Sequence, residues 1–162
     1  MVSSFKEVNL LKKLIDDVVA EITKEFNFPI NYKLGVMVET PRAALKAGEL
    51  AVISSFLSFG TNDLTQMTYG LSRDDSGTFM RDYLEKGIFP VDPFRSLDLD
   101  GVGDLLKIAS KKSRTANPSI KIGICGEHGG DPESIDFCKK IGLDFVSCSP
   151  FRVPIARIAA AQ

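Results

Sequence analysis

The sequence predicts an α/β fold in which parallel strands alternate with helices. Short apolar runs are each followed by a loop rich in Gly, Pro or Asp, and each loop leads into a helix, four times over if Met1-Val2 is the tail of an earlier strand. Such alternation is typical of parallel strands joined by right-handed crossovers. An open sheet and part of a (β/α) barrel both fit, and 162 residues are well short of the roughly 250 of a complete barrel.

The first half of the chain begins with a long amphipathic helix, whose apolar residues recur at spacings of three or four. Ser4 and Glu7 form a capping box at its start, and Thr40-Pro41 marks the start of the next helix. We expect the following elements: a helix over 4–26, a strand over 32–38, a helix over 42–52, a strand over 56–59, and a helix that starts after the loop 60–63.

The second half repeats the same order after an irregular stretch over 70–100. Lysine and arginine in the last turn of one helix, Asn117-Pro118 after it and Asp131-Pro132 before the next set the boundaries. We expect a short helix near 78–86, a helix from 102 to about 116, a strand over 121–125, a helix over 132–142, a strand over 145–148 and a helix over 154–161.

The composition excludes several classes of protein. With 20 Lys+Arg against 21 Asp+Glu, the chain lacks the positive charge of a nucleic-acid-binding domain or of a membrane-surface anchor. No apolar run approaches the roughly 20 residues that span a bilayer. Cys125, Cys138 and Cys148 are an odd number without metal-type spacing, so we expect reduced thiols and a cytoplasmic protein. The chain has a single histidine, His128, which excludes a mechanism that needs two imidazoles.

Three chemically capable side chains follow predicted strands. Glu39 follows the first strand, Asp63 the second and Cys125 the third, and ligands of parallel sheets bind at these carboxyl ends. Two carboxylates on neighbouring strands can share Mg²⁺, which takes its remaining ligands from water and substrate. Two alternatives stay open: Glu39 as a carboxylate at the start of the next helix, and Asp63 as an Asx-turn or helix cap.

The surroundings of these residues offer weaker signals. Gly60-Thr61-Asn62 supplies small residues and N–H groups at a helix start, which suit a phosphate or carboxylate. Cys125 lies among glycines that allow a ligand to approach, although a buried, inert cysteine fits as well. His128 could touch a substrate or be structural. The cationic candidates for anion binding are Arg42, Arg73 and Arg152.

Four stretches of the sequence resemble the C-terminal phosphoenolpyruvate (PEP)-binding barrel of the PEP-utilising enzymes. They are GVMVETPRAA (35–44), SFGTNDLTQMTYG (58–70), GICGEHGGDP (123–132) and VSCSPFRVPIAR (146–157). The resemblance covers residues 1–162, and CGEHGG and SRDD point to the dikinase branch of the family. PEP synthase and enzyme I of the sugar phosphotransferase system, which share the second stretch, are the alternatives.

The resemblance implies a fold and a set of roles. The chain is expected to be the C-terminal half of a (β/α)8 TIM barrel. Glu39 and Asp63 match Mg²⁺-binding acids, Glu39 also lies at the substrate site, and Gly60, Thr61, Asn62 and Asp63 match the loop that contacts PEP or pyruvate. Cys125 matches the acid/base that moves a proton at the methylene carbon.

The resemblance also implies a reaction, in which ATP, phosphate and pyruvate yield AMP, diphosphate and PEP. The domains that bind ATP and carry the phosphohistidine, and the first half of the barrel, are not in these residues. We therefore expect the isolated chain to be inactive and, with two exposed sheet edges, to self-associate. A non-enzymatic module is the third hypothesis; the presence together of Glu39, Asp63 and Cys125 argues against it.

Overall fold

Four parallel strands form one open sheet in the computed structural model, which describes residues 1–162. The strands are β1 (Gly35–Val38), β2 (Phe56–Gly60), β3 (Lys121–Cys125) and β4 (Phe145–Val146). Their spatial order, β1-β2-β3-β4, is also their order along the chain. Each strand therefore pairs with the next one, and the crossing segments carry the helices.

The helices follow the strands in alternation, with short 3₁₀ turns between some of them. They are α1 (Phe5–Phe26), α2 (Pro41–Leu45), α3 (Ala47–Ile53), α4 (Thr61–Tyr69), η1 (Ser76–Thr78), α5 (Met80–Glu85), α6 (Val102–Ala116), η2 (Glu127–Gly130), α7 (Pro132–Lys140), η3 (Pro150–Arg152) and α8 (Val153–Ala161). None of these helices is both long enough and apolar enough to cross a bilayer.

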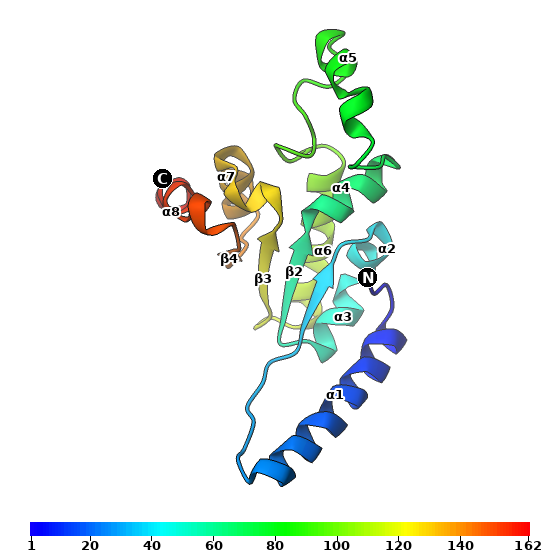
Figure 1. Ribbon diagram of the computed structural model, residues 1–162, viewed down its shortest axis with the longest axis vertical. Coiled ribbons are helices and arrows are strands. Elements are labelled where there is room, and N and C mark those ends of the chain that lie inside the picture. Colours follow the sequence, from blue (N-terminus) through cyan, green and yellow to red (C-terminus); the bar gives the residue numbers. More distant parts are fainter.

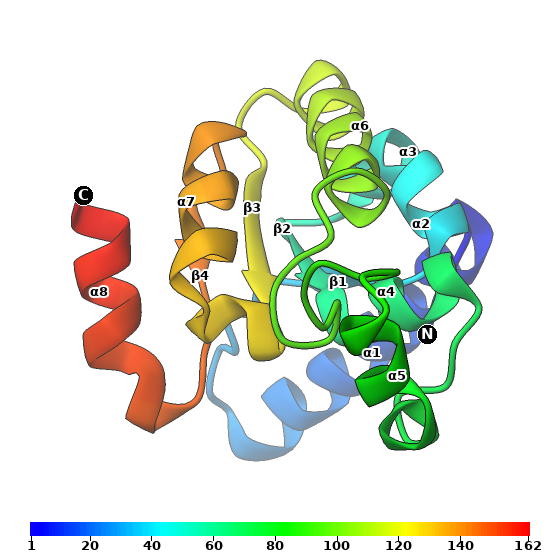
Figure 2. The same ribbon diagram turned by 90° about the horizontal axis from the view of Figure 1, so that it is seen from above.

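The core lies on one face of the sheet, because side chains alternate between faces along a strand. Val38, Leu57, Phe59, Ile122 and Ile124 are fully buried in one apolar cluster with residues of α2, α3 and α6. Figure 2 shows α2, α3 and α6 gathered on one side of the strands, and α7 follows beside β3.

The opposite face of the sheet is largely uncovered. Met37 on β1 is 40% exposed there, and the rings of Phe56 and Phe145 lie over the glycines of the neighbouring strands, Gly35 and Gly123. The first helix, α1, lies beside α3 and the β1 edge rather than across this face (Figure 1). The uncovered face is therefore open to a ligand or to another segment of protein.

The parallel α/β prediction is confirmed, with one restriction. The sheet is open and does not close into a barrel, and Met1-Val2 forms no strand. The predicted helix over 42–52 is two helices, α2 and α3. They are separated at Lys46, whose N–H donates to the carbonyl oxygens of Arg42 and Ala43 and closes the last turn of α2. The strand predicted to start at 32 starts at Gly35.

A projecting arm follows α4 and contains η1 and α5. Figure 1 shows it extending beyond the carboxyl ends of the strands. An edge-to-face contact holds the arm to the end of α4, with the ring centroids of Tyr69 and Phe89 5.4 Å apart, and a second one, with the ring centroids of Phe79 and Tyr83 5.1 Å apart, lies within the arm. The arm thus stands over the end of the sheet where the candidate residues lie.

Candidate functional site

Glu39, Gly60 and Cys125 lie in a row across the carboxyl ends of β1, β2 and β3. Gly60 pairs with Cys125 in the ladder. A Cβ atom at Gly60 would stand 3.0 Å from Oε2 of Glu39 and 3.1 Å from Sδ of Met37. The Met37 sulfur is in turn 3.5 Å from the Cys125 thiol. The carboxylate and the thiol therefore share the uncovered face of the sheet, and both lie around Gly60 and Met37.

Asp63 brings a second carboxylate to Glu39. Burial raises the pKa of Glu39, and the negative charge and hydrogen bonding of Asp63 raise it further. The N-terminal ammonium of Met1, 3.9 Å from Glu39 Oε1, acts in the opposite direction. Two carboxylates that repel each other in a partly buried position favour the binding of a divalent cation, because its charge offsets their repulsion.

Neither acid serves as a helix cap: the alternative of Asp63 as a cap is wrong, and Glu39 lies one residue before the cap of α2. The cap of α2 is Thr40, whose hydroxyl oxygen accepts from the Ala43 N–H at 3.0 Å. The start of α4 has no side-chain cap at all, and Asp63 is the third residue of that helix. The two carboxylates are therefore free to face a ligand.

Thr61 and Asn62 are occupied by the segment after β3. The fully buried Thr61 hydroxyl oxygen lies 2.8 Å from the carbonyl oxygen of Cys125, and the Asn62 side-chain oxygen accepts from the Glu127 N–H at 3.1 Å. The predicted loop 60–63 is in fact the first turn of α4. What Thr61 offers a ligand is its backbone N–H at an uncapped helix start, and not its hydroxyl.

The three thiols differ sharply in environment. Cys125 is half-buried, and its thiol lies 3.4 Å from the Phe59 carbonyl oxygen. Cys138 is buried in the core on α7, and burial raises its pKa to about 12, so it is inert as expected. Cys148 lines a pocket of about 310 Å³ together with Cys125 and Arg152. Of the three, Cys125 is the thiol that shares the Gly60 and Met37 surroundings with Glu39.

The three candidate arginines do not converge. Arg152 shares the pocket of Cys125, where it donates to the Gly130 carbonyl at 3.2 Å. Arg42 on α2 donates to the Ser3 carbonyl, and Arg73 lies at the base of the projecting arm. Arg152 is thus the cation placed to meet an anion beside Cys125.

The donor set fits a hard cation that keeps water or substrate ligands. The structure nowhere gathers three or more His, Cys, Asp or Glu side chains as a metal site. Glu39 and Asp63 supply two carboxylates, which suits Mg²⁺, since Mg²⁺ is commonly bound through one or two carboxylates plus waters and substrate oxygens. A closed zinc site, which needs three or four protein ligands, does not fit.

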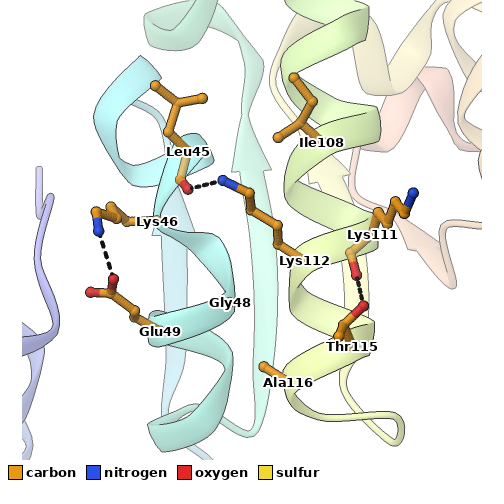
Figure 3. A pocket seen from close by; sticks show the side chains of 9 residues that line it. All are labelled: Leu45, Lys46, Gly48, Glu49, Ile108, Lys111, Lys112, Thr115 and Ala116. Atoms are coloured by element: carbon orange, nitrogen blue, oxygen red, sulfur yellow. Dashed lines mark hydrogen bonds and ion pairs between the residues drawn. The ribbon is translucent and has the colours of Figure 1, made fainter.

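A groove of about 660 Å³ lies elsewhere, in the outer helix layer. It lies between α2 and α3 on one side and α6 on the other (Figure 3), and two of its lysines have partners: Lys112 donates to the Leu45 carbonyl at 2.8 Å and Lys46 pairs with Glu49 at 2.8 Å. The groove carries none of the candidate site residues. The volume of a groove therefore does not identify the candidate functional site of this molecule.

Two residues of the site were missed or undervalued in the sequence. Met37 lies between Glu39 and Cys125, and it shares their face because residues 35, 37 and 39 alternate with the core positions of β1. His128 is fully buried and both of its ring nitrogens are hydrogen-bonded. Its position is therefore that of a structural histidine, one of the two alternatives for this residue.

The fold and this set of residues define a class of protein. Residues 1–162 match the family described as "PEP-utilising enzyme, PEP-binding domain" over their full length. The chain belongs to this family, as the four sequence stretches indicated.

The relatives with established names narrow the class. The chain is 56% identical to "Pyruvate, phosphate dikinase, chloroplastic" of Mesembryanthemum crystallinum and 53% identical to "Pyruvate, phosphate dikinase" of Clostridium symbiosum, in both cases over 100% of this chain. A relative from Arabidopsis thaliana, "Pyruvate, phosphate dikinase 1, chloroplastic", is 58% identical over 96% of this chain. The chain spans 17%, 18% and 16% of the lengths of these relatives.

Proposed function

We propose that this chain is the PEP- and pyruvate-binding part of a pyruvate, phosphate dikinase, a phosphotransferase that interconverts ATP, pyruvate and phosphate with AMP, PEP and diphosphate. The observation that carries the proposal is that Glu39 and Cys125 lie around Gly60 and Met37 on one uncovered face of the sheet, with Asp63 beside Glu39. The relatives named above bear the dikinase name, which favours this enzyme over PEP synthase or enzyme I. ATP and phosphate are assigned to parts of the enzyme outside these residues.

Glu39 and Asp63 would together hold Mg²⁺. When bound, the ion acts as a Lewis acid for the enolate and phosphoryl oxygens. The two acids would hold the ion at the strand ends. Burial first, and then repulsion by Asp63, raise the pKa of Glu39, and this repulsion makes the pair receptive to a cation.

The remaining groups act on the organic part of the substrate. The uncapped first-turn N–H groups of α4, beginning at Thr61, bind a carboxylate or phosphate. The Cys125 thiol, beside them and beside Glu39, gives or takes the proton at the methylene carbon. Asn62 holds the segment after β3 in place through Glu127, which keeps the thiol at this edge.

The open sheet is proposed to be part of a (β/α) barrel, with residues 1–162 as the C-terminal half of the barrel domain. Its strands pair in chain order, and α2, α3 and α6 pack on one face of the sheet. Helices on one face support a barrel wall over a doubly wound sheet, since doubly wound sheets carry helices on both faces. The three free thiols agree with the cytoplasmic placement predicted from the sequence, while plant relatives carry the word chloroplastic in their names.

The metal site is tested with Mn²⁺, which shares the oxygen preference of Mg²⁺ and broadens nearby NMR signals. We expect Mn²⁺, with oxalate as a pyruvate analogue, to broaden the backbone signals of residues 39, 60–63 and 125 first. Glu39→Gln and Asp63→Asn should abolish this broadening. Asp82→Asn, which removes the same charge from the exposed α5, is the matched control and should leave it unchanged. Equal broadening in all four proteins would refute the proposal.

A further inference from the structure

His128 connects three separate segments at the edge of the candidate site. Its side chain is fully buried; its Nδ1 is 2.7 Å from the Thr61 hydroxyl oxygen and its Nε2 is 2.9 Å from the Pro93 carbonyl oxygen. The same Thr61 hydroxyl is 2.8 Å from the Cys125 carbonyl oxygen. One ring thus joins the segment before α6, the first turn of α4 and the end of β3.

The number of protons available to these three contacts decides which of the hydrogen bonds can form at the same time. A carbonyl oxygen only accepts, so the contact with Pro93 requires a proton on Nε2 of His128. The contacts of Thr61 with His128 and with Cys125 require one proton each. A neutral imidazole and one hydroxyl supply two protons for three contacts, whereas an imidazolium and one hydroxyl supply three.

The surroundings favour the neutral ring. Burial lowers the pKa of His128; the Pro93 carbonyl and the charges of Asp131, Glu127 and Asp92 oppose this without outweighing it. The packed elements also carry other charged or titratable groups: Cys125 at the end of β3, Asp63 in the first turn of α4, and Arg152, which lies against Gly130. A neutral ring with its proton on Nε2 accepts the Thr61 proton at Nδ1, so the Thr61 hydroxyl then does not donate to the Cys125 carbonyl.

We infer that His128 is a positioning residue that sets the direction of the Thr61 hydroxyl and thereby controls whether α4 is tied to the Cys125 carbonyl. With the ring neutral, the hydroxyl points to Nδ1. With the ring protonated, Nδ1 donates to Thr61, and Thr61 donates to Cys125. Since Cys125 and the α4 start bind opposite ends of a substrate in the proposed function, the role of this tie in ligand binding rests on that function, whereas the hydroxyl direction does not.

The hydroxyl direction is tested by NMR of protein labelled with ¹⁵N-histidine, in which His128 gives the sole ring signals. At pH 7.5 we expect the Nε2–H tautomer. Thr61→Val should move the Nδ1 signal toward that of an unbonded nitrogen and lower the midpoint of the His128 titration. An Nδ1–H tautomer, or an Nδ1 signal unaffected by Thr61→Val, would overturn the inference whether or not the chain binds substrate.

The positioning role is tested with two amides of different reach. In His128→Asn the amide can donate to Thr61 from the place of Nδ1, and in His128→Gln it can donate to Pro93 from the place of Nε2. In both variants the Thr61 hydroxyl is free to donate to the Cys125 carbonyl, so we expect the Mn²⁺-dependent oxalate affinity at pH 7.5 to differ from that of wild type by about three- to ten-fold, the size of one net hydrogen bond, and in the same direction in both variants. Ile135→Ala, a buried change on α7, is the control for lost stability.

The outcomes separate the two proposals. If the wild-type chain shows no Mn²⁺-dependent oxalate binding, the proposed function fails, and the ¹⁵N result still decides the hydroxyl direction. If the wild-type chain binds and both His128 variants bind oxalate with the affinity of wild type, with thermal stability no lower than that of Ile135→Ala, the positioning role is overturned.

Discussion

Gly60 leaves the space in which Glu39 stands. A Cβ atom at Gly60 would come within 2.8 Å of the Glu39 Cβ and 3.1 Å of the Met37 sulfur. Its φ of −82° is open to any residue, so the requirement is for space and not for backbone freedom. We therefore expect Gly60→Ala to displace Glu39 and to abolish Mn²⁺ broadening while the chain stays folded.

The control for this prediction is Gly77→Ala, because a Cβ at Gly77 meets nothing within 4 Å. Far-ultraviolet circular dichroism checks the fold of both variants, and Mn²⁺ titration checks the site. Unchanged Mn²⁺ broadening in folded Gly60→Ala would show that Glu39 does not need this space.

Glu39 makes the stability of the chain depend on pH. Burial first, and then Asp63, raise its pKa in the folded state. The folded state therefore binds the Glu39 proton more tightly than the unfolded state, and stability falls as the pH rises through the folded pKa. Glu39→Gln should be more stable than wild type at pH 7, and the difference should vanish below the ordinary pKa of 4.5.

Thermal melts across pH 4 to 8 measure this effect, and Mg²⁺ should raise the melting temperature of wild type and leave that of Glu39→Gln unchanged. Glu85→Gln, at an exposed acid paired with Arg81, is the comparison. A melting temperature of Glu39→Gln below that of wild type at pH 7 would contradict the repulsion between the two acids.

Asp144 fastens the end of the sheet opposite the candidate site. Its carboxylate accepts from the Ile122 N–H at 2.9 Å and from Lys121 and Arg114 at 3.0 Å each, which joins β3, α6 and the start of β4. Burial alone would raise the pKa of Asp144, but these three donors outweigh it and hold the pKa below its ordinary value. The stabilisation is therefore present above the unfolded pKa and is lost as the pH falls.

We expect Asp144→Ala to lower the free energy of unfolding by about 2 kcal/mol at pH 7, the range of a hydrogen bond to a charged group. The loss should shrink toward acidic pH, as urea unfolding will measure. Asp136→Ala breaks an exposed ion pair with Lys140 within α7 and should cost about 0.5 kcal/mol or less. Equal losses in the two variants would show that Asp144 is an ordinary surface acid.

In the molecule as a whole, no second layer of protein covers the candidate site. Met37, between the acid and the thiol, is 40% exposed on the uncovered face of the sheet. Water therefore reaches the place where an enolate would form, and the charge interactions that stabilise it are weakened. We predict no detectable enolpyruvate formation or pyruvate proton exchange by this chain alone; clear turnover that Cys125→Ser abolishes would refute this.

The same openness predicts self-association. The outer strands β1 and β4 are edges of the sheet, and large apolar side chains are exposed on α1 and α8, with Leu10 at 69% and Ile158 at 65%. Contiguous apolar surface and free edges favour pairing of copies. Light scattering should show a dimer or larger species that Leu10→Lys with Ile158→Lys reduces; a monomer at millimolar concentration would contradict the prediction.

The strength of the local signals decides which elements were predictable. The span of α1, the Thr40-Pro41 start of α2 and the strand over 121–125 agree with the structure, because caps and periodicity are encoded within a few residues. The break at Lys46 and the immediate start of α4 at Thr61 were missed. Both depend on how the segments pack: Gly48 lies against the α6 backbone, and Thr61 is held by Cys125 and His128.

The amino-acid sequence determined the parallel α/β class, the family and the candidate residues Glu39, Asp63 and Cys125. This was possible because local sequence patterns show in which order the strands occur and where each one ends. The three-dimensional arrangement alone decided that the acids repel each other, that Thr61 turns its hydroxyl away from the ligand, and that His128 is bonded at both nitrogens. These contacts join residues far apart in the chain, up to 67 positions for Thr61 and His128. Their geometry follows from the register of the sheet and from packing, which no local pattern contains.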